Sequence, residues 1–289
     1  MKNKILTGLL LVLIGGWGSL SAQSAGSNYA RQVNTLIGTK GVGLTSGYLY
    51  PGATYPYGMV QFTPSYFSKR SGFVINQLSG GGCEHMGNFP TFPVKGKLKM
   101  SPDNILNYRI NISEEKGHAG YYEAKVQEDI HAKLTVTERT GMASYEYPAD
   151  QQYGTVIIGG GISATPIEQA AIVITAPNKC EGYAEGGNFC GLRTPYKVYF
   201  VAEFDTDALE SGTWKRNELK PNTTFAEGEY SGVYFTFDVN KKKNIQYKIG
   251  VSYVSVENAR ENLKAENTGW DFLQIQNQAE SKWNHYLGK

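Results

Sequence analysis

Alternation of apolar and polar residues dominates the middle of the chain. Residues 121–126 (YYEAKV), 130–138 (IHAKLTVTE) and 142–147 (MASYEY) alternate or are rich in β-branched and aromatic residues, with Gly and Asp between them. Short runs of this kind, separated by turn residues, predict antiparallel strands. The same features predict further strands at 155–158, 171–175, 196–204, 233–238 and 246–255.

Helical periodicity is absent from this whole region, and the spacing between the predicted strands is short. The 20 tyrosines and 34 glycines of the chain suit sheets joined by many turns. We therefore expect an all-β fold, in which residues 28–256 form one large antiparallel β-sandwich of the supersandwich type.

The pattern changes after Val256. Residues 257–266 are good helix formers, Gly269 interrupts them, and apolar residues then recur at helical spacing to the end. Trp270 and Trp283 fall on the apolar face of this second helix. We expect residues 257–289 to form a helical linker that leads to a further domain. Its apolar face is expected to have no partner within the sandwich.

The first 22 residues have the features of a secretory signal peptide. Lys2 and Lys4 precede an apolar run from residue 5 to residue 14, which is too short to span a bilayer. Small residues then allow cleavage before Gln23. We expect a periplasmic or secreted protein that has no membrane attachment after cleavage.

Charge gives no indication of a nucleic-acid partner. The formal net charge is +2, and the one basic run, residues 241–243, lies between Asn240 and Asn244. Lysines flanked by asparagines are typical of a solvated hairpin tip.

Three cysteines are present, at positions 83, 180 and 190. In an oxidising compartment Cys180 and Cys190 are the candidate disulfide, closing the segment CEGYAEGGNFC. The chain-entropy model assigns such a small loop about 3 kcal/mol of stabilisation. Cys83 would then be left as a single thiol.

The segment LSGGGCEHMGNFP, residues 78–90, carries the most chemistry-bearing residues in the shortest span. Its glycines would let a ligand approach the backbone closely. Adjacent Cys83, Glu84 and His85 rarely ligate one tetrahedral ion together, and no C-x-x-C or H-x-x-x-H pair exists elsewhere, so zinc is not favoured. A nucleophilic pair of Cys83 and His85 stays open.

A second glycine-rich segment, GGGISA at residues 159–164, fits the dinucleotide fingerprint G-x-G-x-x-A after a predicted strand. That fingerprint requires a helix whose N-terminus faces the pyrophosphate. Pro166 and the β-branched run 172–174 leave no room for this helix. We therefore interpret the segment as a turn between strands.

Two motifs resemble glycoside hydrolase family 92, which comprises secreted exo-α-mannosidases. The first is VNTLIGTKGVGLTSGYLYPGATYPYGMVQFTP at residues 33–64, which is similar to the family pattern VNPxIGT…PGAxxPFGMVQxSP. The second is the 78–90 segment, which is similar to LSGxGC…GDxPxxP. Asn88 replaces a frequent Asp, and Asn76-Gln77 replaces a common Thr-His pair. The resemblance covers the mature chain but only the N-terminal domain of the family.

The resemblance implies a two-domain enzyme that hydrolyses terminal α-mannosyl linkages of mannose-containing glycans with inversion, assisted by Ca²⁺. In that family the acid, the base and the Ca²⁺ ligands lie mainly on a C-terminal (α/α)₆ barrel. We accordingly expect no catalytic residues and no metal ligands in these 289 residues. The missing barrel is the expected partner of the linker helix, and whether this chain alone is an enzyme stays uncertain.

The resemblance also suggests a role for residues 78–90, namely one wall of a sugar pocket between the sandwich and the barrel. The expected substrate-binding residues are Ser79, Gly80, Gly81, Cys83, Glu84, His85 and Asn88. Two alternatives stay open. One is a non-catalytic carbohydrate-binding sandwich module. The other is a different sandwich enzyme with its site at Cys83 or His85.

Overall fold

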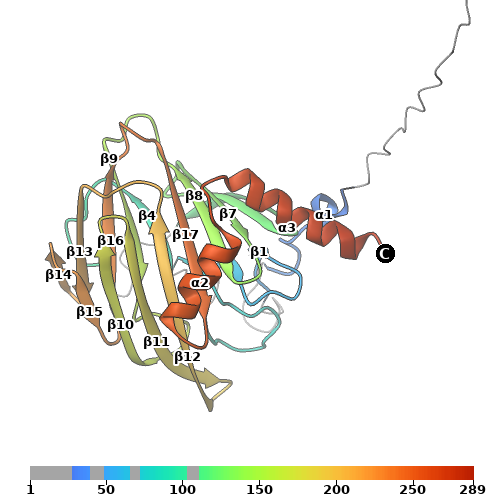
Figure 1. Ribbon diagram of the computed structural model, residues 1–289, viewed down its shortest axis with the longest axis horizontal. Coiled ribbons are helices and arrows are strands. Elements are labelled where there is room, and N and C mark those ends of the chain that lie inside the picture. The colour runs from blue at the N-terminus through green and yellow to red at the C-terminus, as the bar shows by residue number, and fades with distance from the viewer. Residues whose placement is uncertain (1–27, 40–48, 66–71, 103–110) are drawn as a thin grey trace, which may run out of the picture.

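The computed structural model describes residues 28–39, 49–65, 72–102 and 111–289. The predicted signal peptide lies outside the described residues. Within them the chain forms two antiparallel sheets packed face to face, with helices at one side (Figure 1). The predicted all-β sandwich is confirmed.

The sheets contain eight and nine strands within the part of the chain that the structure describes. The eight-stranded sheet has the order β1 (Ala53–Thr54), β2 (Gln61–Pro64), β3 (Phe73–Val74), β4 (Thr91–Lys95), β9 (Tyr153–Gly159), β16 (Ser231–Asp238), β13 (Glu210–Lys215) and β14 (Glu218–Pro221). The nine-stranded sheet has the order β15 (Phe225–Glu227), β10 (Ile167–Ala176), β11 (Lys179–Phe189), β12 (Leu192–Phe204), β17 (Asn244–Ser252), β8 (Thr140–Glu146), β7 (Ile130–Val136), β6 (Tyr121–Val126) and β5 (Ile112–His118).

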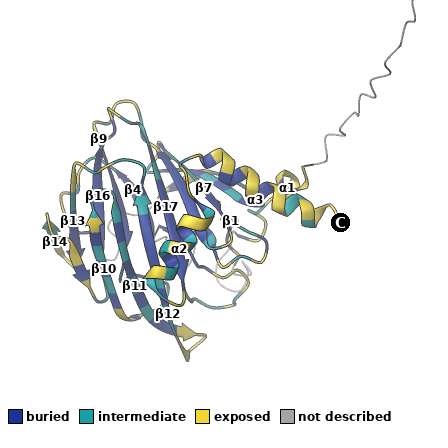
Figure 2. Cartoon of the chain, viewed as in Figure 1, coloured by how far each residue is buried: buried dark blue, intermediate teal, exposed yellow. Residues whose placement is uncertain are grey.

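Aromatic side chains join the two sheets across the core. The ring of Phe204 on β12 lies 5.0 Å from that of Phe235 on β16, and 5.3 Å from that of Tyr247 on β17. All three are fully buried, and Figure 2 shows the same burial along most of the central strands. Large buried rings of this kind account for much of the hydrophobic stabilisation of a sandwich.

Every strand predicted between residues 121 and 255 is present, with ends that differ by a few residues. One segment differs in kind. Residues 180–189 are not a closed loop but belong to β11, whose side chains alternate between buried and half-buried positions up to Gly186. The short strands β1 to β5 and the four-residue helix α1 (Tyr29–Gln32) were not predicted either.

Both turns expected from composition are found. Residues 241–243 lie in the turn between β16 and β17. The GGGISA segment leads from β9 to β10 with no helix after it, which agrees with its interpretation as a turn.

Two helices follow the last strand, as the sequence predicts. Helix α2 (Val256–Glu266) packs on β17 and β12, and helix α3 (Phe272–Leu287) packs on β6, β7 and β8 and against α1. Their N-caps are Ser255 and Asp271, whose side chains accept backbone N–H groups of the first turn. No helix in the described ranges combines the length and apolarity needed to cross a membrane.

The apolar face of α3 has its partner inside the chain, contrary to the prediction. Trp283 is half-buried, and its indole Nε1 donates to the carbonyl oxygen of Thr54 at 2.7 Å. Trp270 lies just before α3 rather than on it as predicted, and is half-buried beneath Lys248, whose Nζ lies 4.3 Å from the ring centroid. The expectation failed because helical periodicity shows that a face is apolar but does not show which surface covers it.

Candidate functional site

The 78–90 loop connects β3 to β4 at one end of the eight-stranded sheet. It contains five residues with φ between 53° and 77°, which are Gly80, Gly82, Met86, Gly87 and Phe89. A residue with a side chain in this left-handed region costs about 1–2 kcal/mol. The positions of Met86 and Phe89 therefore have to be imposed by surrounding contacts, a feature that concentrates at functional sites.

A disulfide closes this loop, but not the predicted one. Cys83 is bonded to Cys190, with 5.4 Å between their Cα atoms. Cys180 is fully buried within β11 and is a free thiol, and burial raises its pKa. Ten residues of extended strand span about 33 Å, whereas a disulfide needs Cα atoms within about 7 Å. The predicted Cys180–Cys190 pairing is therefore wrong because both residues belong to one continuous strand and its end.

The side chain of His85 is buried beneath the loop, and Gly81, Cys83 and Phe189 surround it. Its ring is 3% exposed, and Nδ1 lies 2.8 Å from the carbonyl oxygen of Cys83. Phe189, at the end of β11, meets the imidazole edge to face at 4.9 Å between ring centroids. A Cβ at Gly81 would come within 2.4 Å of the imidazole Cε1, so only glycine fits there.

Asn88 lies at the centre of a buried amide and phenol network. Its Oδ1 accepts from Asn76 Nδ2 at 2.9 Å and from the Tyr196 hydroxyl at 2.7 Å. Asn76 Oδ1 in turn accepts the Asn88 backbone N–H at 2.7 Å, and Asn76 Nδ2 also reaches the Tyr253 hydroxyl at 3.4 Å. Burial raises the pKa of Tyr196 to about 12, against the opposing effect of the Asn88 hydrogen bond, so this phenol remains a donor at neutral pH.

Three polar atoms beneath the loop have no hydrogen-bond partner among the described residues, namely Gln77 Oε1, His85 Nε2 and Asn88 Nδ2. Their residues are linked, since Gln77 Nε2 donates to the His85 carbonyl at 2.9 Å and Asn76 joins Asn88. An unpaired buried polar group costs about 1–3 kcal/mol. Such a cluster calls for a hydroxyl-rich ligand or ordered water as its partner.

The predicted binding residues divide into an outer rim and a buried floor. Ser79, Gly80, Gly81, Cys83 and Glu84 lie on the rim, at exposed or half-exposed positions. His85 and Asn88 form the floor. On the rim, Ser79 Oγ accepts from Gln61 Nε2 at 2.9 Å, which ties the loop to the start of β2.

Several residues of this site were not singled out from the sequence. Phe189, Tyr196 and Tyr253 come from β11, β12 and the segment after β17, all far beyond the loop in sequence. No sequence spacing relates them to it. The partner of Cys83 had one usable signal, because the alternation through 180–186 identifies a strand and excludes the local disulfide.

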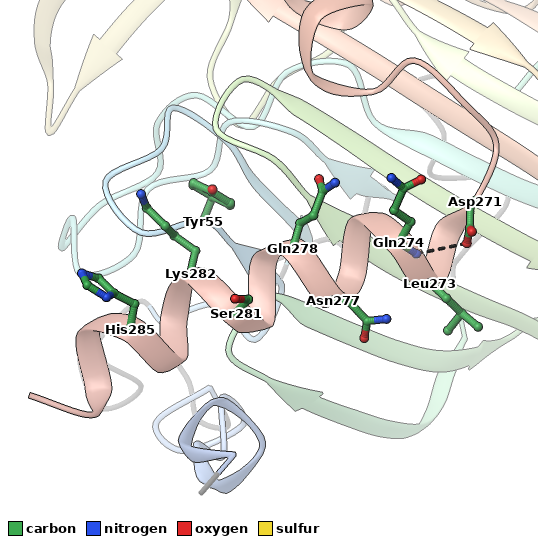
Figure 3. Close-up of a pocket in the computed structure, with 9 residues that line it drawn as sticks. All are labelled: Tyr55, Asp271, Leu273, Gln274, Asn277, Gln278, Ser281, Lys282 and His285. Atoms are coloured by element: carbon green, nitrogen blue, oxygen red, sulfur yellow. Dashed lines mark hydrogen bonds between the residues drawn. The ribbon is translucent and has the colours of Figure 1, made fainter. Parts of the chain in front are cut away.

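A second concave surface lies on the outward side of α3, with a volume of about 850 Å³. Figure 3 shows Gln274, Gln278, Lys282 and His285 along one stripe of the helix, with Tyr55 across from it. Amides and an ammonium group dominate this lining. The neighbouring ring of Tyr57 is 88% exposed and meets Tyr286 at 5.2 Å.

A third hollow, of about 470 Å³, lies over the edge strands β5 to β7. Some of the charged side chains that line it are paired with one another. Lys125 Nζ lies 2.7 Å from a Glu114 carboxylate oxygen, and His131 Nε2 lies 3.2 Å from Glu123. Among the described residues, no three His, Cys, Asp or Glu side chains meet closely enough to hold a metal ion.

Comparison with known proteins gives one family. The profile of the glycosyl hydrolase family 92 N-terminal domain matches residues 32–252. A curated protein of Arthroderma benhamiae, described as an uncharacterized secreted glycosidase, is 26% identical over 89% of this chain and 38% of its own length.

Solved structures of this family share the fold. A family GH92 glycosyl hydrolase superposes with a TM-score of 0.79 at 22% identity, covering 90% of this chain and 37% of its own. An α-mannosidase of the family from Bacteroides thetaiotaomicron, solved with mannoimidazole, gives 0.78 at 24% identity, with 90% and 37% coverage. The chain therefore spans less than two fifths of the length of these relatives.

Proposed function

Because the chain belongs to glycosyl hydrolase family 92 through its N-terminal domain, we propose that it is the sandwich half of a calcium-dependent, inverting exo-α-mannosidase. Its substrates would be glycans that end in α-linked mannose. Two proteins of similar structure are described as mannosidases, one of them inverting, which supports this assignment of the reaction.

The observation that carries the proposal is the buried cluster under the 78–90 loop. Sugar hydroxyls are both donors and acceptors, so a mannose ring suits an unpaired amide N–H, an unpaired amide carbonyl and an imidazole nitrogen. Gly80 and Gly82 have open space where side chains would be, which leaves room for a ligand to approach the backbone of the rim. The loop would bind and orient the sugar in a pocket completed by a second domain.

Proton transfer is assigned to that second domain. Inverting hydrolysis uses two carboxyl groups about 6.5–9.5 Å apart, one as acid and one as base towards water. Glu84 is the one carboxylate of the loop. The role of this chain is thus to hold the sugar and exclude water from one side of it.

The proposed calcium ion would polarise the sugar hydroxyls it contacts. No metal-binding trio of acidic, histidine or cysteine side chains exists within the described part of this chain. Following the family resemblance, we propose that the calcium ligands lie mainly on the second domain.

The second domain would dock on the outward side of α3. That surface is hollowed, with amides at Gln274, Asn277 and Gln278 and an exposed Leu273. Mixed polar and apolar surfaces are typical of contacts between domains.

Secretion is part of the same proposal. The N-terminal signal pattern, the disulfide and the secreted description of the fungal relative support an oxidising location outside the cytoplasm.

An assay of α-mannoside hydrolysis with Ca²⁺ tests this division of labour. The 289-residue chain alone should give no turnover, whereas a polypeptide that joins it to the helical domain should release mannose with inverted anomeric configuration, detected by proton NMR. Robust hydrolysis by the chain alone would contradict the proposal.

One observation favours the alternative of a non-catalytic carbohydrate-binding module. Helix α3 folds back on the sandwich, and Trp283 and Trp270 contact Thr54 and Lys248 of the sandwich, as a self-sufficient module requires. Mannoside binding by the chain, together with no hydrolysis by the two-domain polypeptide, would establish this alternative.

A further inference from the structure

The hairpin of β11 and β12 extends past both of its neighbours in the sheet. Strand β10 pairs with β11 only as far as Gly186, and β17 pairs with β12 only from Tyr199 onward. The intervening end of the hairpin, residues 187–198, therefore projects beyond the sheet and ends at the turn Cys190-Gly191. The 78–90 loop is bonded to this projecting end.

On the rim of the loop, the Cys83–Cys190 disulfide makes the link to the hairpin, and Ser79 Oγ makes a separate link to Gln61 of β2. The floor is held by the Tyr196–Asn88 hydrogen bond and the Phe189–His85 ring contact. On the rim, nothing in the described residues lies within 4 Å of the Cβ positions of Gly80 and Gly82. The backbone around Gly80 and Gly82 is therefore the loosely packed part of the rim, where a covalent restraint nearby limits local opening most.

The disulfide is also accessible to reagents. Cys190 is exposed and Cys83 is half-exposed, whereas the remaining thiol, Cys180, has no exposed surface. Accessible disulfides react with external thiols, and buried sulfur atoms do not. An added thiol should therefore react with the Cys83–Cys190 disulfide and leave the buried Cys180 unchanged.

From these observations we propose that the Cys83–Cys190 disulfide is a redox latch that fixes the 78–90 loop against the β11–β12 hairpin. Resting on the proposed function, the latch controls sugar affinity, because a released rim has to be ordered again on each binding event. The oxidised protein is the high-affinity form.

The switching reaction needs a reducing dithiol. A thiolate of the dithiol attacks one of the two sulfur atoms, the Cys83–Cys190 bond breaks, and a mixed disulfide forms. The second thiolate of the reductant then attacks the mixed disulfide, and the protein cysteine leaves as a thiolate. Two electrons pass to the protein, Cys83 and Cys190 each gain a proton, and the reductant leaves as a cyclic disulfide.

Hydrogen exchange measured with and without dithiothreitol tests the latch. Amides of residues 79–87 should exchange about tenfold faster or more after reduction, while those of β6 to β8 stay unchanged. The variant C83S/C190S should match the reduced protein without reductant. Cys180→Ala is the matched control, and its loop should still respond to dithiothreitol.

Affinity for methyl α-mannoside, measured in parallel, should fall about tenfold on reduction. The appearance of two new titratable thiols shows that the disulfide has been reduced. Equal hydrogen exchange of the loop in the oxidised and reduced proteins would then overturn the latch. If the oxidised chain binds no mannoside but loop exchange still accelerates, the latch stands and the proposed function fails. Because reduction acts on the folded protein, the test does not depend on the folding of the double variant.

Discussion

At the scale of single residues, the loop is built around one buried imidazole. The backbone of residues 81–83 wraps the ring of His85, and Phe189 covers its other side. Because interiors are closely packed, an added methyl group next to this ring has nowhere to go without moving the loop. Gly81 is therefore the position at which the smallest change should have the largest local effect.

Gly81→Ala should lower the free energy of unfolding by about 1–3 kcal/mol, because its Cβ would overlap the imidazole. Truncating the ring removes the overlap. The added cost of Gly81→Ala should therefore shrink strongly in a His85→Ala background, as measured by denaturant unfolding of all four forms. Additive costs would show that the two residues do not interact.

A second residue-scale feature is the buried carboxylate of Glu280 on α3. It accepts from Arg31 Nε at 2.9 Å and Gln276 Nε2 at 2.7 Å, and His118 Nε2 lies 3.6 Å away. Burial acts to raise the pKa of Glu280, but the hydrogen bonds from Arg31, Gln276 and Asn28 outweigh it and hold the pKa below its usual value. The carboxylate joins α1 to α3.

Glu280→Gln should cost about 2 kcal/mol of stability at neutral pH. With a depressed folded pKa, the ionised contribution is complete above the unfolded pKa of about 4.3 and is lost as pH falls through the folded value. The stability difference between wild type and variant should thus be constant near pH 7 and narrow below about pH 4.3. Glu218→Gln, at an exposed pair with Lys220, is the matched control and should change little. A pH-independent difference would contradict this account of Glu280.

At the scale of elements, α3 has two faces with different roles. Its inner face packs on the sandwich through Phe272, Ile275 and Ala279, and Figure 2 shows its outer face exposed. The stability of the chain should depend on the inner face, and docking of a second domain should depend on the outer face.

Trp283→Phe removes the hydrogen bond to Thr54 and should lower stability by about 1 kcal/mol. Gln278→Ala, on the outer face, should leave the melting temperature of this chain unchanged and weaken its association with the helical domain. Calorimetry of the chain and titration with that domain measure the two effects. Equal loss of stability in both variants would show that the outer face is not free for docking.

Prediction from the sequence succeeded for elements with a strong local pattern. Periodic apolar positions define these elements locally, as in the strands at 121–126 and 130–138 and in both helices. The disulfide predicted between Cys180 and Cys190 was wrong because two cysteines close in sequence were paired locally, although the alternation of a strand was present between them. The Cys83–Cys190 bond and the contacts of Asn88 depend on tertiary pairing across 107 and 108 residues, which no local pattern contains.

At the scale of the whole molecule, the described part of the chain is a sandwich with a polar site at one end, and some buried atoms of this site have no hydrogen-bond partner. The unpaired atoms of Gln77, His85 and Asn88 belong to a floor that lacks a partner among the described residues. The proposed pocket shared with a second domain would account for this arrangement, because each half would leave some of its polar groups for the ligand.

Amide chemical shifts, followed by NMR while methyl α-mannoside is added to the oxidised chain, test this account most directly. We predict saturable shifts at residues 79–88 and around Tyr196 and Tyr253, at millimolar sugar concentrations, with no such changes at the charged hollow over β5 to β7. Absence of loop shifts up to about 100 mM sugar, or saturation at a different surface, would contradict it.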